Sequence, residues 1–288
     1  MASRFDRHEN GTDGRLLGPD DPHPVAVSNP GATSSFLLVG DHAGVASPVA
    51  LGNLGVSPGD WERHIACDIG SRALGQALAE RLDARFIHQR YSRLVIDCNR
   101  DPAHRDAIAL NSDRTVIPGN HGLSDQQHRQ RVAEIHAPYH AAITAELAQR
   151  DDRKDPPILV SLHSFTPLWK GELRPWHAGV LHGGGADRFA LAVLARLIDA
   201  LDAAIGDNQP YRLDATDYTV PLHAIVPGLA YVELEIRQDL LATADGIASW
   251  AKRLAAVLQA ARQDTSRHRS AEAPHKPRAS AHPGTPDG

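Results

Sequence analysis

Two histidines in this sequence stand at the ends of short apolar runs, where a metal ion can be held. His42 follows the run at residues 35–40, and His163 follows the run at residues 158–162. Runs of this length and branching predict buried strands, and buried parallel strands deliver functional side chains at their carboxyl ends. The small residues 43–44 leave room for a ligand beside the first imidazole. With one carboxylate added, the pair predicts a mononuclear zinc hydrolase site.

The carboxylate can come from residues 61–82, whose apolar stripe predicts a helix. His64 and Asp68 are four residues apart and would therefore share a helix face. Either of them could complete the metal site. Two histidines and one carboxylate leave the fourth position of a zinc ion open for water, which is the catalytic arrangement. Zinc then lowers the pKa of that water towards neutrality.

A third apolar run, at residues 230–236, carries two glutamates. Glu233 and Glu235 point to the same face because strand residues alternate. Amide hydrolysis at zinc needs a group that moves protons, and two carboxylates on one face of a buried strand are costly without such a role. We favour Glu235 as the general base and Glu233 as a structural residue. The alternative is that one of them only pairs with Arg237.

Two arginines and an asparagine flank residues 94–96, which we expect to form a short strand. Arg93 precedes that strand, and Asn99 and Arg100 follow it. An arginine fork binds a carboxylate through two parallel hydrogen bonds, and asparagine adds a neutral donor. The cluster therefore either holds a substrate carboxylate or lies on a surface strand with solvated arginines, and the spacing favours neither.

The bulk composition is that of an ordinary globular protein. The chain has 288 residues, 42% of them hydrophobic, and a formal net charge of −5. This charge gives no reason to expect nucleic acid or an anionic membrane as a partner, and no apolar stretch is long enough for a transmembrane helix. Cys67 and Cys98 are the only cysteines and no secretory signal is visible, so we expect a cytoplasmic location. The oligomeric state is not indicated.

Strand and helix patterns alternate along the middle of the chain. Beyond the segments above, we expect strands at 84–88 and 177–181 and helices at 124–150, 187–205 and 245–261. Ser124 and Gln127 form a capping box, and Pro138 should kink or split the helix that they start. The alternation predicts an α/β protein with a mixed, mainly parallel sheet between layers of helices.

Composition also sets the expected domain boundaries. Residues 1–24 are polar and are expected to form a flexible N-terminus, and residues 25–262 a single catalytic domain. Residues 263–288 hold no apolar residue larger than alanine or proline. Such a segment buries too little surface to offset its ordering entropy, so we expect a disordered tail.

An ordered series of short motifs resembles the N-formylglutamate amidohydrolase family. The motifs are Asp41-His42-Ala43-Gly44, WERHIACDIG at 61–70, Tyr91-Ser92-Arg93, Asp97-Cys98-Asn99-Arg100, Pro138-Tyr139-His140, Leu162-His163-Ser164 and Glu233-Leu234-Glu235. They follow one another in the expected order over residues 35–250, and the chain looks closer to a less characterised branch of that family.

The resemblance implies a three-layer α/β/α fold of the zinc-carboxypeptidase-like (phosphorylase/hydrolase-like) kind, with one zinc ion per chain. It also implies a role for each of seven residues: zinc ligands at His42, Asp68 and His163, proton transfer by Glu235, and a substrate carboxylate held by Arg93, Asn99 and Arg100.

We therefore expect a zinc-dependent amidohydrolase that acts on the amide of an N-formyl or N-acyl amino acid with a free carboxylate. N-formylglutamate, giving formate and glutamate, is the leading candidate. A zinc carboxypeptidase, another N-acyl amino acid deacylase and a metal-retaining binding protein without catalysis remain alternatives. Residues 169–176 and 206–220 are expected to form loops that frame the ligand.

Overall fold

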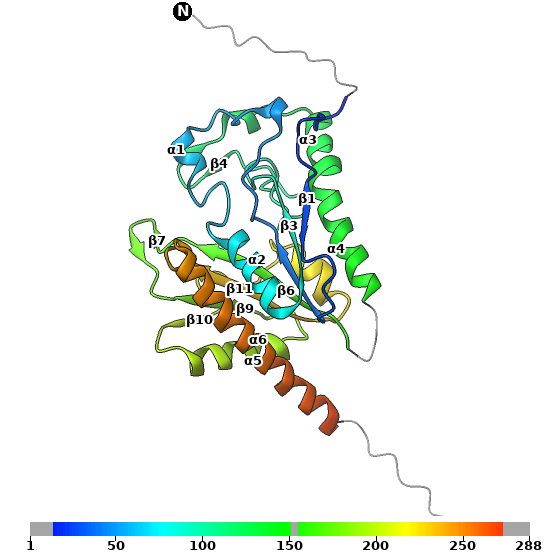
Figure 1. Cartoon of the computed structure of the whole chain (residues 1–288). Helices are drawn as coiled ribbons and strands as arrows, with labels where there is room; N and C mark the ends of the chain where they lie inside the picture. The colour runs from blue at the N-terminus through cyan, green and yellow to red at the C-terminus, as the bar shows by residue number, and fades with distance from the viewer. Residues whose placement is uncertain (1–13, 151–154, 273–288) are drawn as a thin grey trace, which may run out of the picture.

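The computed structural model describes residues 14–150 and 155–272, with side chains up to residue 267. A β-sheet forms the centre of this part of the chain (Figure 1). Within these parts, seven strands follow in the spatial order β1 (Val25–Ser28), β3 (Arg85–Gln89), β2 (Phe36–Gly40), β6 (Ile158–Phe165), β11 (Ala230–Arg237), β9 (Ala178–Leu181) and β10 (Ile205–Asp207). The central four strands are parallel, β1 and β9 pair antiparallel with β3 and β11, and β10 is parallel to β9. The expected mixed, mainly parallel sheet is confirmed.

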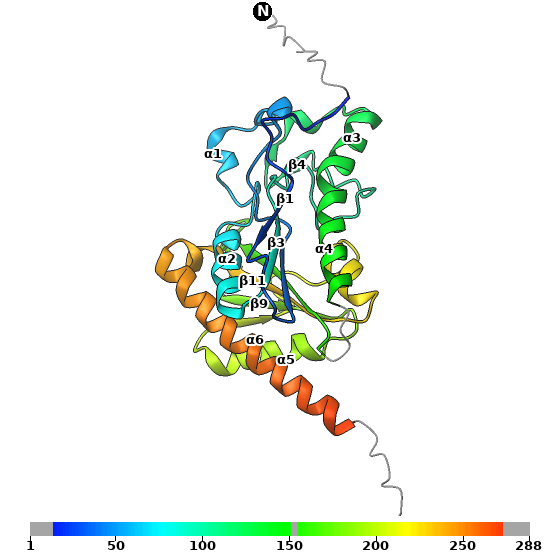
Figure 2. The ribbon, with the colours of Figure 1, turned by 45° about the vertical axis from the view of Figure 1, so that its right-hand side comes forward.

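Helices cover both faces of this sheet, so the three-layer α/β/α prediction is also confirmed. One face carries α2 (Ser71–Leu82), α5 (Arg188–Ala200) and α6 (Ala244–Glu272). The other carries α4 (Ala137–Gln149) and the π-helical segment η4 (Pro221–Ile225). Figure 2 shows α2 and α4 on opposite sides of β1 and β3. In the described part of the chain, no helix combines the length and the apolar composition that crossing a membrane requires.

The strands bury both faces, which explains why their sequences are continuously apolar rather than alternating. On β2, Phe36 and Leu38 pack with the core under α2, α5 and α6. The intervening Leu37 and Val39 pack with Tyr139 and other residues under α4. The central strands therefore separate two apolar cores, and the side chains at their carboxyl ends lie at the edge of these cores.

Shorter elements surround that carboxyl edge. They are η1 (Val49–Leu51), α1 (Pro58–Trp61), β4 (Asn111–Ser112), β5 (Thr115–Val116), η2 (Pro118–Asn120), β7 (Leu168–Trp169), β8 (Glu172–Leu173) and η5 (Gln238–Leu241). Many of the turns between them pack around a third apolar cluster that includes Ile65, Tyr91 and Val95.

The helix expected at 61–82 was wrong in its first half, because the chain leaves the helix after α1 and re-enters it only at α2. Between these helices the backbone bonds to distant segments. The N–H of Asp68 donates to the carbonyl of His42 at 2.9 Å, and the carbonyl of Ala66 accepts from the N–H of Arg93 at 3.2 Å. These long-range bonds replace the i→i−4 ladder that the apolar stripe predicted.

The strand expected at 94–96 was wrong as well, since these residues form a buried turn. Their carbonyl groups are satisfied by side chains instead of a neighbouring strand. Asn120 Nδ2 donates to the carbonyl of Leu94, and Arg131 Nη1 to the carbonyl of Val95, each at 2.9 Å. Local sequence could not show these partners, which come from α3 (Asp125–Arg131) and η2.

The capping box is confirmed, with Ser124 Oγ accepting from the N–H of Gln127. The helix that it starts is split into α3, a π-helical segment η3 (Val132–His136) and α4. Pro138 lies in the first turn of α4. A proline is tolerated there because N–H groups of the first turn have no intrahelical partner.

Part of the stretch 14–24, which was expected to belong to a flexible N-terminus, contacts the rest of the domain. The backbone N–H groups of Leu16 and Leu17 donate to the carboxylate of Glu134 at 2.8 and 2.9 Å. The side chain of Leu16 is buried. Residues 1–13, which the same prediction covered, lie outside the described residues.

At the other end, α6 continues to Glu272, past the boundary expected at 262. The helix therefore extends into the first part of the segment that was expected to be a disordered tail. Asp264 forms two hydrogen bonds with Arg196 of α5, at 2.8 and 2.9 Å, and Thr265 is buried. These contacts fix the polar helix without large apolar residues. The remainder of the predicted tail, 273–288, lies outside the described residues.

Candidate metal centre and active site

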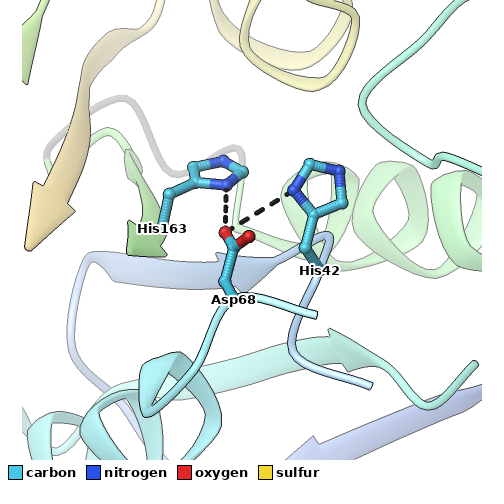
Figure 3. Close-up of side chains that lie close together, drawn as sticks. All are labelled: His42, Asp68 and His163. Atoms are coloured by element: carbon cyan, nitrogen blue, oxygen red, sulfur yellow. Dashed lines mark hydrogen bonds and ion pairs between the residues drawn. The ribbon is translucent and has the colours of Figure 1, made fainter. Parts of the chain in front are cut away.

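Two histidines and an aspartate from three distant segments meet at the carboxyl edge of the sheet (Figure 3). His42 follows β2, His163 lies near the end of β6, and Asp68 lies in the turn before α2. Asp68 Oδ2 is 2.9 Å from His163 Nδ1 and 3.5 Å from His42 Nδ1. All three side chains are buried, and one ligand atom of each lies within 4.8 Å of the others.

The donor set fits a divalent cation. Two imidazole nitrogens and a carboxylate oxygen converge, and His42 Nδ1 is buried without any hydrogen bond. A buried imidazole nitrogen without a partner is costly unless something else satisfies it. A cation in the space between the three side chains would do so. We refer to His42, Asp68 and His163 as the triad.

The outer nitrogens of both triad imidazoles face hydrogen-bonding partners. His42 Nε2 is 2.7 Å from Asp97 Oδ1. His163 Nε2 is 3.0 Å from Ser161 Oγ and 3.4 Å from Asp41 Oδ2. A carboxylate on the outer N–H fixes the tautomer and leaves the inner nitrogen free for a metal. Each imidazole is thereby oriented with Nδ1 towards Asp68.

Asp41 is held in place by two hydroxyl groups. Tyr139 Oη and Thr219 Oγ1 donate to its Oδ1 at 2.7 and 2.9 Å, while Oδ2 lies 3.4 Å from His163 Nε2. Burial alone would raise the pKa of Asp41, but the hydrogen bond and charge of His163 lower it to about 2. Asp41 is therefore a fixed negative charge behind the second imidazole.

Glu235 extends the site across the sheet, because it pairs with His163 in the parallel register of β11 and β6. Its side chain is 6% exposed, and Oε2 has no hydrogen bond. Burial raises the pKa of Glu235 to about 8. Glu233, two residues earlier, is also buried, with its pKa likewise raised to about 8 and Oε1 lying 3.8 Å from His163 Nε2.

Arg93 forms an ion pair with Asp97 and also lies close to the carboxylate of Asp68. Its Nη2 donates to Asp97 Oδ2 at 2.7 Å, and its Nη1 lies 3.5 Å from Asp68 Oδ1. Burial would lower the pKa of this guanidinium, but the two aspartates raise it above its ordinary value. Arg93 therefore links the triad to the carboxylate behind His42.

Asn99 and Arg100 lie next to one another on the pocket wall. Asn99 Oδ1 accepts from the backbone N–H groups of Tyr218 and Thr219, and its Nδ2 donates to Asp217 at 3.2 Å. Arg100 Nη1 donates to the carbonyls of Asn99 and Thr216, at 2.8 and 3.0 Å. These contacts fix both side chains in place.

His64 does not replace Asp68 in the triad. Its Nε2 lies 3.7 Å from Asp113 Oδ2, and its ring meets Trp169 edge-on. Nor does Gly44 leave space for a ligand: a Cβ there would come within 2.1 Å of the backbone of Arg90. The glycine permits a close chain crossing instead.

One pocket of about 540 Å³ contains all seven residues to which the sequence analysis gave a role. Such a volume is within the range of small-molecule sites. Of the loops expected to frame a ligand, Trp169, Tyr211 and Thr216 line this pocket. Arg174 and Trp176 are not among its lining residues.

The sequence predicts no role for Asp41 or Asp97, although both stand in the motifs that resemble the family. The available signal was position, since Asp41 directly precedes His42 and Asp97 precedes the Asn99-Arg100 pair. Their roles depend on contacts across the fold, which spacing does not reveal.

A comparison with protein families matches residues 34–242 to the family described as N-formylglutamate amidohydrolase. No curated protein sequence matches the chain.

Among solved structures, the Atu2144 gene product of Agrobacterium tumefaciens is 33% identical, with a TM-score of 0.84 over 88% of this chain and all of that one. The N-formylglutamate amidohydrolase of Ralstonia eutropha JMP134 is 17% identical, with a TM-score of 0.66 over 86% of this chain and all of that one, and so shows a shared fold. The length of the family match and the identity to the Agrobacterium protein show that this chain belongs to the N-formylglutamate amidohydrolase family, whose members are hydrolases of amide bonds.

Proposed function

We propose that this chain is a zinc-dependent amidohydrolase that cleaves the amide of an N-formyl amino acid. N-formylglutamate, hydrolysed to formate and glutamate, is the leading substrate, as the family suggests. The observation that carries the proposal is the convergence of the triad and the buried Glu235 in one pocket. Amide hydrolysis requires an electrophilic centre and a proton carrier side by side, and this pocket offers residues suited to both.

Zinc suits the donor set of the triad, because it favours imidazole nitrogen with a carboxylate and keeps one position open in catalytic sites. Nδ1 of His42, Nδ1 of His163 and Oδ2 of Asp68 would hold one ion per chain. When bound, zinc supplies Lewis-acid activation of a water molecule and of the amide carbonyl.

Glu235 moves the proton. It takes a proton from the water that attacks the formyl carbon, and delivers a proton to the leaving nitrogen when the C–N bond breaks. The products are formate and the free amine. Burial raises the pKa of Glu235 to about 8, and a nearby dication would favour the ionised form that a base requires.

Arg93, Asn99 and Arg100 hold the substrate carboxylate in this proposal. Within the described residues, Arg100 donates its hydrogen bonds through Nη1. Its other guanidinium nitrogens, Nε and Nη2, are therefore available to a ligand. One of the two Nδ2 hydrogens of Asn99 is donated to Asp217, and the other is available to a ligand. Arg93 contributes positive charge beside the triad while it orients Asp68.

A deacylase of larger N-acyl amino acids is the second candidate. The pocket volume of about 540 Å³ exceeds what a formyl group and a small amino acid fill, so a longer acyl chain would fit. A zinc carboxypeptidase would need the same residues. We propose a cytoplasmic location in either case, supported by the free thiols of Cys67 and Cys98.

Metal analysis of the purified chain, combined with a screen of N-formyl and N-acetyl amino acids for release of free amine, tests the proposal. We expect about one zinc per chain and the fastest turnover with N-formyl substrates. Faster release from N-acetyl substrates would favour the deacylase. A protein that binds no metal, or releases no amine with zinc present, would contradict the proposal.

A further inference from the structure

Two buried histidines, His136 and His140, lie directly behind the turn that carries Asn99 and Arg100. His136 is the last residue of η3, and His140 lies in the first turn of α4. The π-helical conformation of η3 is rare in proteins and is frequent at functional sites. The two imidazole ring centres are 4.5 Å apart, and neither histidine lines the pocket. Any effect that they have on a ligand must therefore pass through the residues that they contact.

Each histidine donates a hydrogen bond to a backbone carbonyl of this turn. His140 Nε2 lies 2.9 Å from the carbonyl oxygen of Cys98. His136 Nε2 lies 3.0 Å from the carbonyl oxygen of Arg100. A carbonyl oxygen only accepts hydrogen bonds, so Nε2 carries the proton in both rings. Burial lowers the pKa of His136, and that of His140 to about 3, so both rings are neutral at pH 7. The two bonds hold the chain on either side of Asn99.

The turn at 97–100 belongs to no strand or helix, so its position depends on contacts of this kind. Buried backbone carbonyls need a donor, and here two imidazoles supply it. On its other side, Asn99 Oδ1 accepts from the backbone N–H groups of Tyr218 and Thr219, at 3.0 and 2.9 Å. A shift of the turn would therefore displace the Asn99 amide and the Arg100 guanidinium together. A misplacement of about 1 Å in a substrate-holding group can cost 10²-fold in rate.

We propose that His136 and His140 are positioning residues for the substrate carboxylate. They fix the turn at 97–100 so that Asn99 and Arg100 can hold one and the same group. This inference rests on the proposed function, which assigns the carboxylate to that pair. The competing view is that the two histidines only fill the space between α4 and the turn. An apolar side chain would then serve as well, whereas our proposal requires a side chain with a donor.

Hydrogen exchange tests the fixation of the turn. The N–H groups of Tyr218 and Thr219 report on Asn99, because both bond to its Oδ1. His136→Leu and His140→Leu should each accelerate exchange in peptides that cover 97–100 and 218–219 by about tenfold, the effect of losing one buried hydrogen bond. Peptides from β2 and β6 should exchange as in the wild type. Unchanged exchange at the turn in both variants would overturn the proposal.

Kinetics test whether the fixation serves the carboxylate. The measurement is kcat/KM of the zinc-loaded enzyme for N-formylglutamate and for its α-amide. In both leucine variants the ratio of acid to amide should fall by about tenfold, while turnover of the amide changes less than about threefold and zinc stays at about one per chain. His136→Gln, whose side-chain amide can donate to the same carbonyl, should keep most of the wild-type ratio. Leucine variants that keep the wild-type ratio would overturn the proposal.

His88→Leu is the matched control. His88 is a buried histidine on β3 that also contacts a backbone carbonyl, that of Gln89 at 3.1 Å, but it packs against Phe86 and does not line the pocket. Its replacement should leave the substrate ratio and the exchange at 97–100 unchanged. Equal effects in His88→Leu and the other leucine variants would show that general loosening of the domain is responsible, and would overturn the proposal.

Failure of the proposed function gives a different result, namely that the wild type hydrolyses neither substrate. Hydrogen exchange needs no turnover and still decides whether the two histidines fix the turn. Two separate leucine variants are used so that the test stands if one of them does not fold, which circular dichroism shows.

Discussion

Glu235 on β11 lies directly opposite His163 on β6, because the two strands pair in parallel register over their whole length. The proposed general base and a proposed metal ligand are thus held on adjacent strands and lie on the same face of the sheet. Regular strands hold side chains more rigidly than loops do, and catalysis depends on such fixed placement.

Glu235→Gln preserves the shape of the side chain but removes its ability to take a proton. We expect kcat to fall by about 10²–10⁴, with zinc content unchanged. Steady-state kinetics and metal analysis on the same preparation give both values. Glu233→Gln is the matched control on the same face of β11, and its loss should be smaller. A fully active Glu235→Gln variant would show that another residue carries the proton.

His163→Ala removes one of the two triad imidazoles. We expect zinc per chain to fall from about one to near zero, because two remaining ligands hold the ion weakly. Circular dichroism should show that the domain remains folded. His64→Ala is the control, since His64 lines the pocket outside the triad, and it should retain its zinc. A His163→Ala protein with a full zinc complement would refute the ligand assignment.

Asp97→Asn should weaken zinc binding without abolishing it. The carboxylate lies 2.7 Å from His42 Nε2, and loss of such an outer partner costs about 10–100-fold in metal affinity. Competition with a chelating dye measures the affinity. Asp106→Asn, which changes an acidic pocket residue outside the triad and its outer carboxylates, should leave it unchanged. Equal affinities in the two variants would mean that Asp97 has only a structural role.

A second pair of histidines, His140 and His223, should make stability depend on pH. His140 Nδ1 lies 2.9 Å from His223 Nε2, and His140 Nε2 lies 2.9 Å from the carbonyl of Cys98. A carbonyl only accepts, so His140 donates from Nε2 and receives the proton of His223 at Nδ1. Burial lowers the pKa of His140 to about 3 and that of His223 to about 4.

Both histidines bind protons more weakly when folded than when unfolded, where the ordinary pKa is about 6.5. The stability that they contribute is therefore present above about pH 6.5 and lost as the pH falls towards 4. For His223 the loss is on the order of 3 kcal/mol in the free energy of unfolding. Urea unfolding of the metal-free protein between pH 7 and 4 measures it, and His223→Asn should show a shallower slope. Identical slopes would contradict the neutral pair.

The sequence predicted the sheet well, because the apolar runs that became β2, β6 and β11 owe their structure to burial, which is visible in composition. It predicted residues 61–82 poorly, because the backbone around Asp68 is held by a bond to the carbonyl of His42. An apolar stripe predicts local helix but carries no information about such distant partners.

The candidate site was likewise predictable only where it does not depend on distant contacts. The sequence indicated His42, Asp68 and His163 as candidate metal ligands, since only a few amino-acid types bind metal ions. The sequence did not predict the pairing of Arg93 with Asp97 or the two hydroxyl groups that donate to Asp41. These contacts depend on side-chain positions that only the complete fold determines.

A free carboxylate on the substrate should be required, since the proposed function places it at Arg100 and Asn99, which line the same pocket as the triad. Binding that group positions the amide for attack, so its loss should lower the rate as well as the affinity. Amidation of the α-carboxylate of N-formylglutamate should reduce kcat/KM by about 10² or more, the effect of losing a charge-assisted contact of roughly 3 kcal/mol. Arg100→Lys should cause a comparable loss with the free acid, because an ammonium group cannot reproduce the planar fork. Equal turnover of the free and amidated substrates would show that Arg100 only braces the pocket wall through its bonds to the carbonyls of Asn99 and Thr216.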